Sequence, residues 1–131
     1  MKSDEMNRRI DEFTEHRGSL YTGGIVLRAF IDFRRYGNVT NEYRAFYFRG
    51  QLLSICRNSN QPDSCPYVSH DFVDSFTELP SNYYTVDFAE TSHRVWIVIE
   101  TGDGQVSGLS PKQYVFKYYD DMREIQKKCG E

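Results

Sequence analysis

The stretch "YYTVDFAETSHRVWIVIETGDG", residues 83–104, is the most informative part of the chain for its architecture. Its two halves, "YYTVDFAE" and "RVWIVIET", are rich in the β-branched and aromatic residues that strands favour, with a polar turn between them. We therefore expect an antiparallel hairpin. Each half also carries a carboxylate, Asp87 in the first and Glu100 in the second, where an apolar strand has no structural need of one.

The spacing of these carboxylates predicts a metal site. Side chains alternate along a strand, and a turn centred near residues 92 and 93 places Glu100 opposite Thr85 and diagonal to Asp87, with Cα atoms about 7–8 Å apart. Mg²⁺ prefers oxygen ligands and is often held by one or two carboxylates together with substrate phosphates. Asp103, in the glycine-flanked turn after the second strand, is a further candidate ligand.

A structural explanation of the same carboxylates stays open. Regular alternation puts Glu100 on the face of Trp96 and Val98, from which its side chain can reach solvent. Asp87 can cap a strand end, and Asp103 can belong to an ordinary turn. A slip of one residue in the hairpin register would separate the two candidate ligands, so the register decides between these interpretations.

The remaining segments predict an α+β fold with a mainly antiparallel sheet and helices packed on one face. The expected elements, in chain order, are a helix from Ser3 to a stop at Gly18, a strand over 25–33, a hairpin of 42–48 and 51–56 joined by Arg49-Gly50, a loop over 58–67, a short helix within 69–79, the hairpin described above, and a C-terminal helix that begins at Ser110-Pro111.

Length and composition predict one globular domain over residues 1–131, since 39% of the residues are hydrophobic and 15% aromatic. The net charge of −3 gives no overall positive field, so a nucleic-acid partner is not expected without a local basic patch. Three cysteines without C-x-x-C spacing indicate free thiols in a reducing compartment. No apolar run is long enough to span a bilayer, so we expect a cytoplasmic protein without a membrane partner.

These segments, taken in order over residues 23–109, resemble the ATP-grasp family. "YTVDFAETSHRVWIVIETGDGQ" is similar to the closing strands of that fold, "GGIVLRAFIDF" to its hinge strand, and "NEYRAFYFRGQLL" to the hairpin that follows. The ending "VIETGDGQVSGL" resembles a bacterial and phage clade of the family. The resemblance implies the C-terminal lobe of an ATP-grasp fold, with ATP and Mg²⁺ as cofactors. It also implies ATP-dependent ligation of a small-molecule or peptide carboxylate to an amine or a similar nucleophile.

The resemblance assigns a nucleotide-binding role to several residues. It places the backbone from Ala29 to Ile31 against adenine, with Arg28 where many relatives carry a glutamate. Glu42 takes the position that commonly binds the ribose hydroxyls. Arg44 lies two residues further along the same strand face, and its planar fork suits phosphate or an acyl phosphate, which makes it the catalytic candidate.

The resemblance also assigns the metal positions, to Asp87 and Glu100. Many relatives carry an asparagine two residues after that glutamate, whereas this chain has Gly102 followed by Asp103, the remaining metal candidate. ATP-grasp enzymes close ATP between two lobes, and the lobe before the hinge usually supplies phosphate-binding lysines. The only lysine before residue 25 is Lys2, so we expect a separate N-terminal lobe or a homodimer to complete the site.

A non-catalytic module that binds RNA or a protein partner is the alternative. Aromatic residues interleaved with arginines, as in "YRAFYF", can stack the bases of single-stranded RNA when they lie on an open sheet face. Aromatic residues in strands more commonly fill a core, and that interpretation is favoured here.

Overall fold

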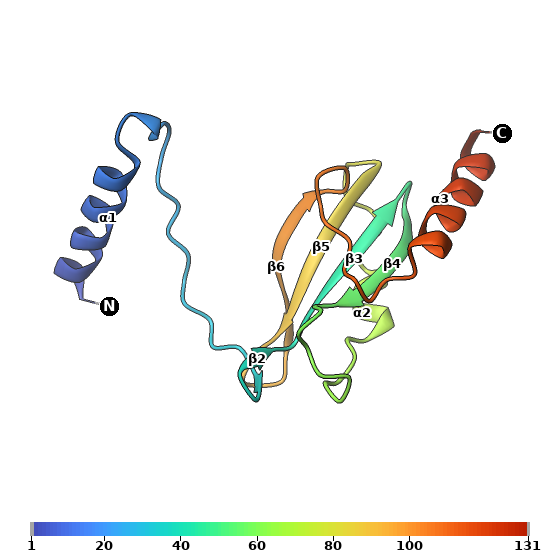
Figure 1. Ribbon diagram of the computed structural model, residues 1–131, viewed down its shortest axis with the longest axis horizontal. Coiled ribbons are helices and arrows are strands. Elements are labelled where there is room, and N and C mark those ends of the chain that lie inside the picture. The colour runs from blue at the N-terminus through green and yellow to red at the C-terminus, as the bar shows by residue number, and fades with distance from the viewer. Residues whose placement is uncertain (1, 131) are drawn as a thin grey trace. The chain divides into compact units, whose positions relative to one another are not determined.

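The computed structural model describes residues 2–130 and divides into two compact units, Met1–Phe30 and Ile31–Glu131 (Figure 1). In the first unit, α1 spans Ser3–Arg17 and ends at Gly18, whose φ of 52° lies in the left-handed region. Asp4 near its start and Arg17 at its end suit the helix dipole. Ser3 is the first helical residue, and Lys2 occupies the capping position without a side-chain hydrogen bond.

The apolar side of α1 faces an extended segment of the same unit. Met6, Ile10 and Phe13 line a cleft of about 390 Å³ with the residues 24–27. Within α1, which the structure describes in full, no residue is buried. The helix is therefore covered on one side only, and incompletely.

The prediction of a strand over residues 25–33 is wrong. Residues 24–32 are extended but belong to no strand, and only Phe33 forms an isolated antiparallel bridge, with Thr91. The composition favours a strand, yet a β-ladder also requires a neighbouring strand, and the described part of the chain provides none here. As a result Val26 and Phe30 are 79% and 91% exposed.

The second unit is built on a four-stranded antiparallel sheet with the strand order β4-β3-β5-β6 (Figure 1). Its strands are β3 (Glu42–Phe48), β4 (Gln51–Arg57), β5 (Tyr83–Glu90) and β6 (Trp96–Asp103). Both predicted hairpins are confirmed, the first with positive φ at Arg49 and Gly50. A small hairpin of β1 (Arg35–Tyr36) and β2 (Val39–Thr40) was not predicted, and it turns at Gly37.

The α+β class and the mainly antiparallel sheet are confirmed, but the helices of this unit pack on opposite faces rather than on one. On the first face, α2 (His70–Asp74) contributes Val73 to a core with Tyr47 and Phe88. On the second, α3 (Val115–Gly130) contributes Tyr118 and Ile125 to a core with Phe46. We call these the α2 face and the α3 face. Successive residues of β3 are buried on alternate faces, so this strand is packed on both sides.

The C-terminal helix begins later than predicted, at Val115 rather than at Ser110-Pro111. The Ser110 hydroxyl donates to the Arg57 carbonyl at 3.1 Å, and its backbone N–H donates to Gln113 Oε1 at 2.7 Å. Ser110 is therefore hydrogen-bonded to the last residue of β4, and the helix starts after this contact. None of the helices within residues 2–130 combines the length and the apolar character needed to cross a membrane.

Candidate functional site

The register of β5 and β6 brings the two candidate metal ligands together, although not as predicted. Asp87 pairs with Glu100 directly, whereas Thr85, the expected partner of Glu100, pairs with Gly102. The pairing shifts by one residue between Asp87 and Phe88, which is a β-bulge. Directly opposed residues have Cβ atoms about 4.5–5.5 Å apart, closer than the diagonal arrangement expected.

The bulge also determines the face on which Glu100 lies. Phe88 pairs with Val98 and Asp87 with Glu100, so Ile99 is the extra residue of β6. In a regular strand Glu100 would share the face of Val98, as the sequence predicted. The extra residue reverses the alternation, and Glu100 joins Asp87 on the α3 face.

Arg44 completes a charged row across three strands. It pairs with Asp87 in the β3–β5 register, so that Arg44, Asp87 and Glu100 follow one another across β3, β5 and β6. Arg44 Nε donates to Asp87 Oδ1 and Nη2 donates to Oδ2, both at 2.8 Å. Bidentate pairs of this kind combine charge with fixed geometry.

Asp87 has the largest influence on the pKa of Arg44. Hydrogen bonding to Asp87 raises the pKa of Arg44, partial burial opposes the rise, and the negative charges of Asp87 and Glu100 add to it. Arg44 offsets one of the two carboxylates, which leaves the row with a net charge of about −1. Each carboxylate offers about four lone-pair sites, so Asp87 retains about two after binding Arg44. The donor set therefore fits a hard divalent cation held by two carboxylates together with phosphate oxygens.

Asp103 does not join the row. It pairs with Tyr84, whose side chain belongs to the core on the α2 face, and its Oδ1 accepts the Gln105 backbone N–H at 2.9 Å. This contact is typical of an aspartate that forms its own turn. Within residues 2–130, no three His, Cys, Asp or Glu side chains gather into a metal-binding group, so any cation here would need ligands from elsewhere.

The residues predicted to bind nucleotide lie in both units. Glu42 is on β3, two residues before Arg44, and its Oε2 accepts the Thr40 hydroxyl at 2.5 Å. Arg28 and Ala29 belong to the extended segment of the first unit, and Ile31 opens the second unit. The role of this segment against adenine, and that of Glu42 at the ribose, stay predictions.

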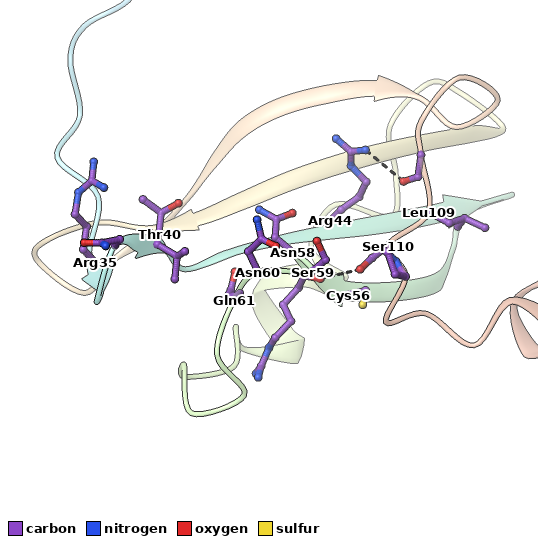
Figure 2. Close-up of a pocket in the computed structure, with 15 residues that line it drawn as sticks. Arg35, Thr40, Arg44, Cys56, Asn58, Ser59, Asn60, Gln61, Leu109 and Ser110 are labelled. Atoms are coloured by element: carbon purple, nitrogen blue, oxygen red, sulfur yellow. Dashed lines mark hydrogen bonds between the residues drawn. The ribbon is translucent and has the colours of Figure 1, made fainter.

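A cleft of about 710 Å³ adjoins Arg44 on the α3 face (Figure 2). Its walls come from three parts of the sequence: the β1–β2 hairpin, the loop from Asn58 to Gln61, and the segment from Gly108 to Pro111. Arg44 Nη1 reaches this last wall and donates to the Gly108 carbonyl at 3.4 Å. Sequence reasoning missed the cleft. Its only sequence signal was the unbroken run of polar residues in "NSNQ".

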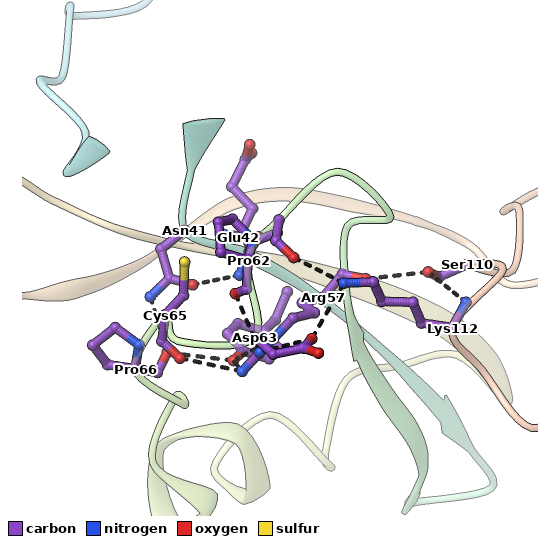
Figure 3. A network of polar contacts seen from close by, with 11 residues as sticks. Asn41, Glu42, Arg57, Pro62, Asp63, Cys65, Pro66, Ser110 and Lys112 are labelled. Carbon is purple, nitrogen blue, oxygen red and sulfur yellow. Dashed lines mark hydrogen bonds and ion pairs between the residues drawn. The ribbon is translucent and has the colours of Figure 1, made fainter. Parts of the chain in front are cut away.

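A buried network holds the loop that forms one wall of the cleft (Figure 3). Arg57 is 5% exposed, and its Nη2 donates to the Tyr43 hydroxyl at 2.7 Å and to the Cys65 carbonyl at 3.2 Å. Its guanidinium also lies 4.3 Å from the ring centre of Tyr67. Lys112 Nζ donates to the Gln61 carbonyl at 2.8 Å. The base of the loop is thus fixed to β4 and to the segment that leads into α3.

The aromatic residues of β3 fill the two cores. Tyr43, Phe46 and Tyr47 are all buried, so their rings are not available to stack nucleic-acid bases. This is the packing that the sequence favoured for "YRAFYF".

Comparison with known families agrees with this arrangement. A family model described as the ATP-grasp domain, R2K clade family 3, matches residues 2–126. The chain belongs to this family, and the predicted resemblance to ATP-grasp proteins is confirmed. Searches of curated proteins and of solved structures each found no match.

Proposed function

We propose that this chain binds Mg-ATP on the α3 face and forms part of an ATP-dependent ligase that joins a carboxylate to an amine. The observation that carries the proposal is the row of Arg44, Asp87 and Glu100, which the β6 bulge assembles on one face in a chain of the ATP-grasp family. Asp87 and Glu100 would hold the cation. When bound, Mg²⁺ supplies positive charge to the phosphates of ATP.

The chemistry supports a cation at this position. Two opposed carboxylates repel each other, and Arg44 compensates only one of them. A divalent cation removes the remaining negative charge and leaves coordination positions for phosphate oxygens. The exposed side of Glu100 keeps this position open to a ligand.

Arg44 has the geometry to act on the transferring phosphoryl group. Two of its nitrogens bind Asp87, so the guanidinium is held in place, while Nη1 makes only the long contact with Gly108. A fixed guanidinium stabilises negative charge on a phosphoryl group or an acyl phosphate without reorganising during the reaction. Glu42, on the same strand, would orient the ribose hydroxyls.

The proposed reaction has two steps. The carboxylate of the substrate attacks the γ-phosphorus of ATP, which forms an acyl phosphate and releases ADP. An amine then attacks the acyl carbon, which forms an amide and releases phosphate. An N-terminal lobe or a second copy of the chain would supply further phosphate-binding groups.

Titration calorimetry with ATP, with and without Mg²⁺, tests the proposal. Wild-type protein should bind ATP in a Mg²⁺-dependent manner, and Glu100→Gln should weaken that binding by about 10-fold or more, the loss of one charged contact. Glu124→Gln, an exposed glutamate on α3, is the matched control and should bind as wild type does. Equal binding by Glu100→Gln and wild type would contradict the proposed role of the row.

A further inference from the structure

The cleft beside Arg44 presents polar side chains that the protein itself does not use. Within residues 2–130, no hydrogen bond or ion pair involves the side chains of Arg35, Asn38, Asn58, Ser59 or Asn60, all of which line the cleft. Other polar side chains of the wall are occupied. Figure 2 shows Arg35 at one end of the cleft, Leu109 and Ser110 at the other, and the loop residues between them.

The charge of the cleft is positive although the chain as a whole is acidic. Among its described lining residues are three arginines and no aspartate or glutamate. Arg57 directs its guanidinium away from the cleft, toward Tyr43 and Asp63, and Arg44 is paired with Asp87. Among the described lining residues, Arg35 is the charge without a carboxylate partner, and a lone guanidinium matches a single carboxylate better than a polyphosphate.

The neutral groups of the cleft match amide groups of a ligand. Each side-chain amide of Asn38, Asn58 and Asn60 offers two donors and one acceptor, the complement of a peptide unit. The volume of about 710 Å³ lies within the ordinary range for small-molecule sites and accommodates an amino acid or a short peptide.

We propose that this cleft binds an amino acid or short peptide, with its carboxylate on Arg35 and its amino group directed toward the acyl phosphate that Arg44 would hold. The asparagine side chains then bind the peptide units between these ends. This inference names the acceptor substrate of the proposed ligase, and it therefore rests on the proposed function. The amine attacks the acyl carbon, the bond between that carbon and the phosphate oxygen breaks, and the proton of the amine leaves with the phosphate. Binding of the peptide, in contrast, requires neither ATP nor a second lobe.

The test uses triglycine and triglycine amide as probes, and ¹H–¹⁵N spectra of the full 131-residue chain as the readout. Triglycine should shift the side-chain signals of Asn38, Asn58 and Asn60 in a saturable manner. Triglycine amide lacks the carboxylate and should bind about 10-fold more weakly, the loss of one charge-assisted contact. Arg35→Gln should reduce triglycine affinity to the same extent. Arg123→Gln removes an arginine of α3 that does not line the cleft, and it should bind as wild type does.

Either of two results would overturn the inference: no saturable shift of the asparagine signals up to the solubility of triglycine, or equal affinities for triglycine and its amide. Inorganic phosphate is titrated in parallel. If phosphate shifts the asparagine signals in a saturable manner and Arg35→Gln abolishes this shift, the ligand of Arg35 is a phosphate and not the carboxylate proposed here. Calorimetry with Mg-ATP separates the two proposals. If the protein binds peptide but not Mg-ATP, the cleft is a peptide site and the proposed Mg-ATP site is rejected. If it binds Mg-ATP but not peptide, the Mg-ATP site is retained and the peptide site is rejected.

Discussion

The α2 face of the sheet is buried by apolar packing over β3 and β5, whereas the α3 face is apolar at one end and polar at the other. Tyr47, Val86 and Phe88 are buried on the α2 face. On the α3 face, Phe46 packs against α3, while Arg44, which is paired with Asp87, lines an open cleft. The same strands supply both faces, so alternation along β3 and β5 separates the residues for stability from those for binding.

Phe88→Ala should have the largest effect on stability. Phe88 is fully buried on the α2 face, and truncating such a side chain costs about 3–5 kcal/mol of unfolding free energy. Urea denaturation followed by circular dichroism measures this loss, with Val95→Ala, an exposed position, as the control. The folded fraction should still bind Mg-ATP. A loss of less than 1 kcal/mol relative to the control, on the order of a surface substitution, would show that the α2 face is not the stabilising one.

Asp87→Asn should affect both stability and binding, because Asp87 is the acceptor for Arg44 and a candidate metal ligand. The loss of a charge-assisted pair is expected to cost about 1–3 kcal/mol of unfolding free energy, and Mg-ATP binding should disappear. Asp120→Asn removes the acceptor of another arginine, Arg123, on the exposed side of α3. This control should change the unfolding free energy by no more than about 1 kcal/mol. Retained Mg-ATP binding by Asp87→Asn would remove Asp87 from the site.

Tyr47→Phe tests the α2 face through the pH dependence of the unfolding free energy. The Tyr47 hydroxyl donates to the Val73 carbonyl at 2.6 Å, and burial, with the nearby Tyr84 and Asp74, raises its pKa above the ordinary value of 10.0. The protonated phenol is favoured in the folded state, so its contribution is complete below about pH 10 and is lost as the pH rises further.

Unfolding free energies of wild type and Tyr47→Phe, measured by urea denaturation from pH 8 to pH 11, on either side of the phenol's ordinary pKa of about 10, check this expectation. The variant should lose about 1 kcal/mol at pH 8, the contribution of one hydrogen bond, and should decline less steeply above pH 10. Parallel curves for the two proteins would contradict the assignment.

Asp103→Asn should have the smallest effect. Asp103 forms the turn at the end of β6 and lies apart from the row on the α3 face. The unfolding free energy of the variant should therefore differ from that of wild type by no more than about 0.5 kcal/mol. Mg-ATP affinity, measured by calorimetry, should equal that of wild type. A 10-fold loss, equivalent to about 1.4 kcal/mol, would restore Asp103 as a metal ligand.

The sequence was sufficient to predict the two main hairpins and the pairing of their strands. It could not predict the bulge, because any residue of the apolar run in β6 can leave the ladder, and the choice of Ile99 depends on the packing of both faces. The sequence therefore predicted Asp87 and Glu100 as neighbours on one face, but not that they are directly opposed; their role as metal ligands stays a prediction.

The remaining differences arise from contacts between distant segments. The cleft is formed by residues near 35–40, 58–61 and 108–111, and no local pattern announces that these segments will meet. The segment 25–33 has the composition of a strand but lacks a neighbouring strand in the described chain, which composition alone does not reveal.

Paramagnetic broadening by Mn²⁺, which substitutes for Mg²⁺ at oxygen-ligand sites, tests the central claim most directly. We predict that Mn²⁺ added with ATP broadens the ¹H–¹⁵N backbone signals of Arg44, Asp87 and Glu100 selectively, and that Glu100→Gln abolishes this pattern. Signals of Tyr47 and Val73 on the α2 face should broaden less and only at higher Mn²⁺ concentration, because the effect falls steeply with distance from the ion. Broadening that is centred elsewhere, or that is unchanged in Glu100→Gln, would contradict a cation held between Asp87 and Glu100.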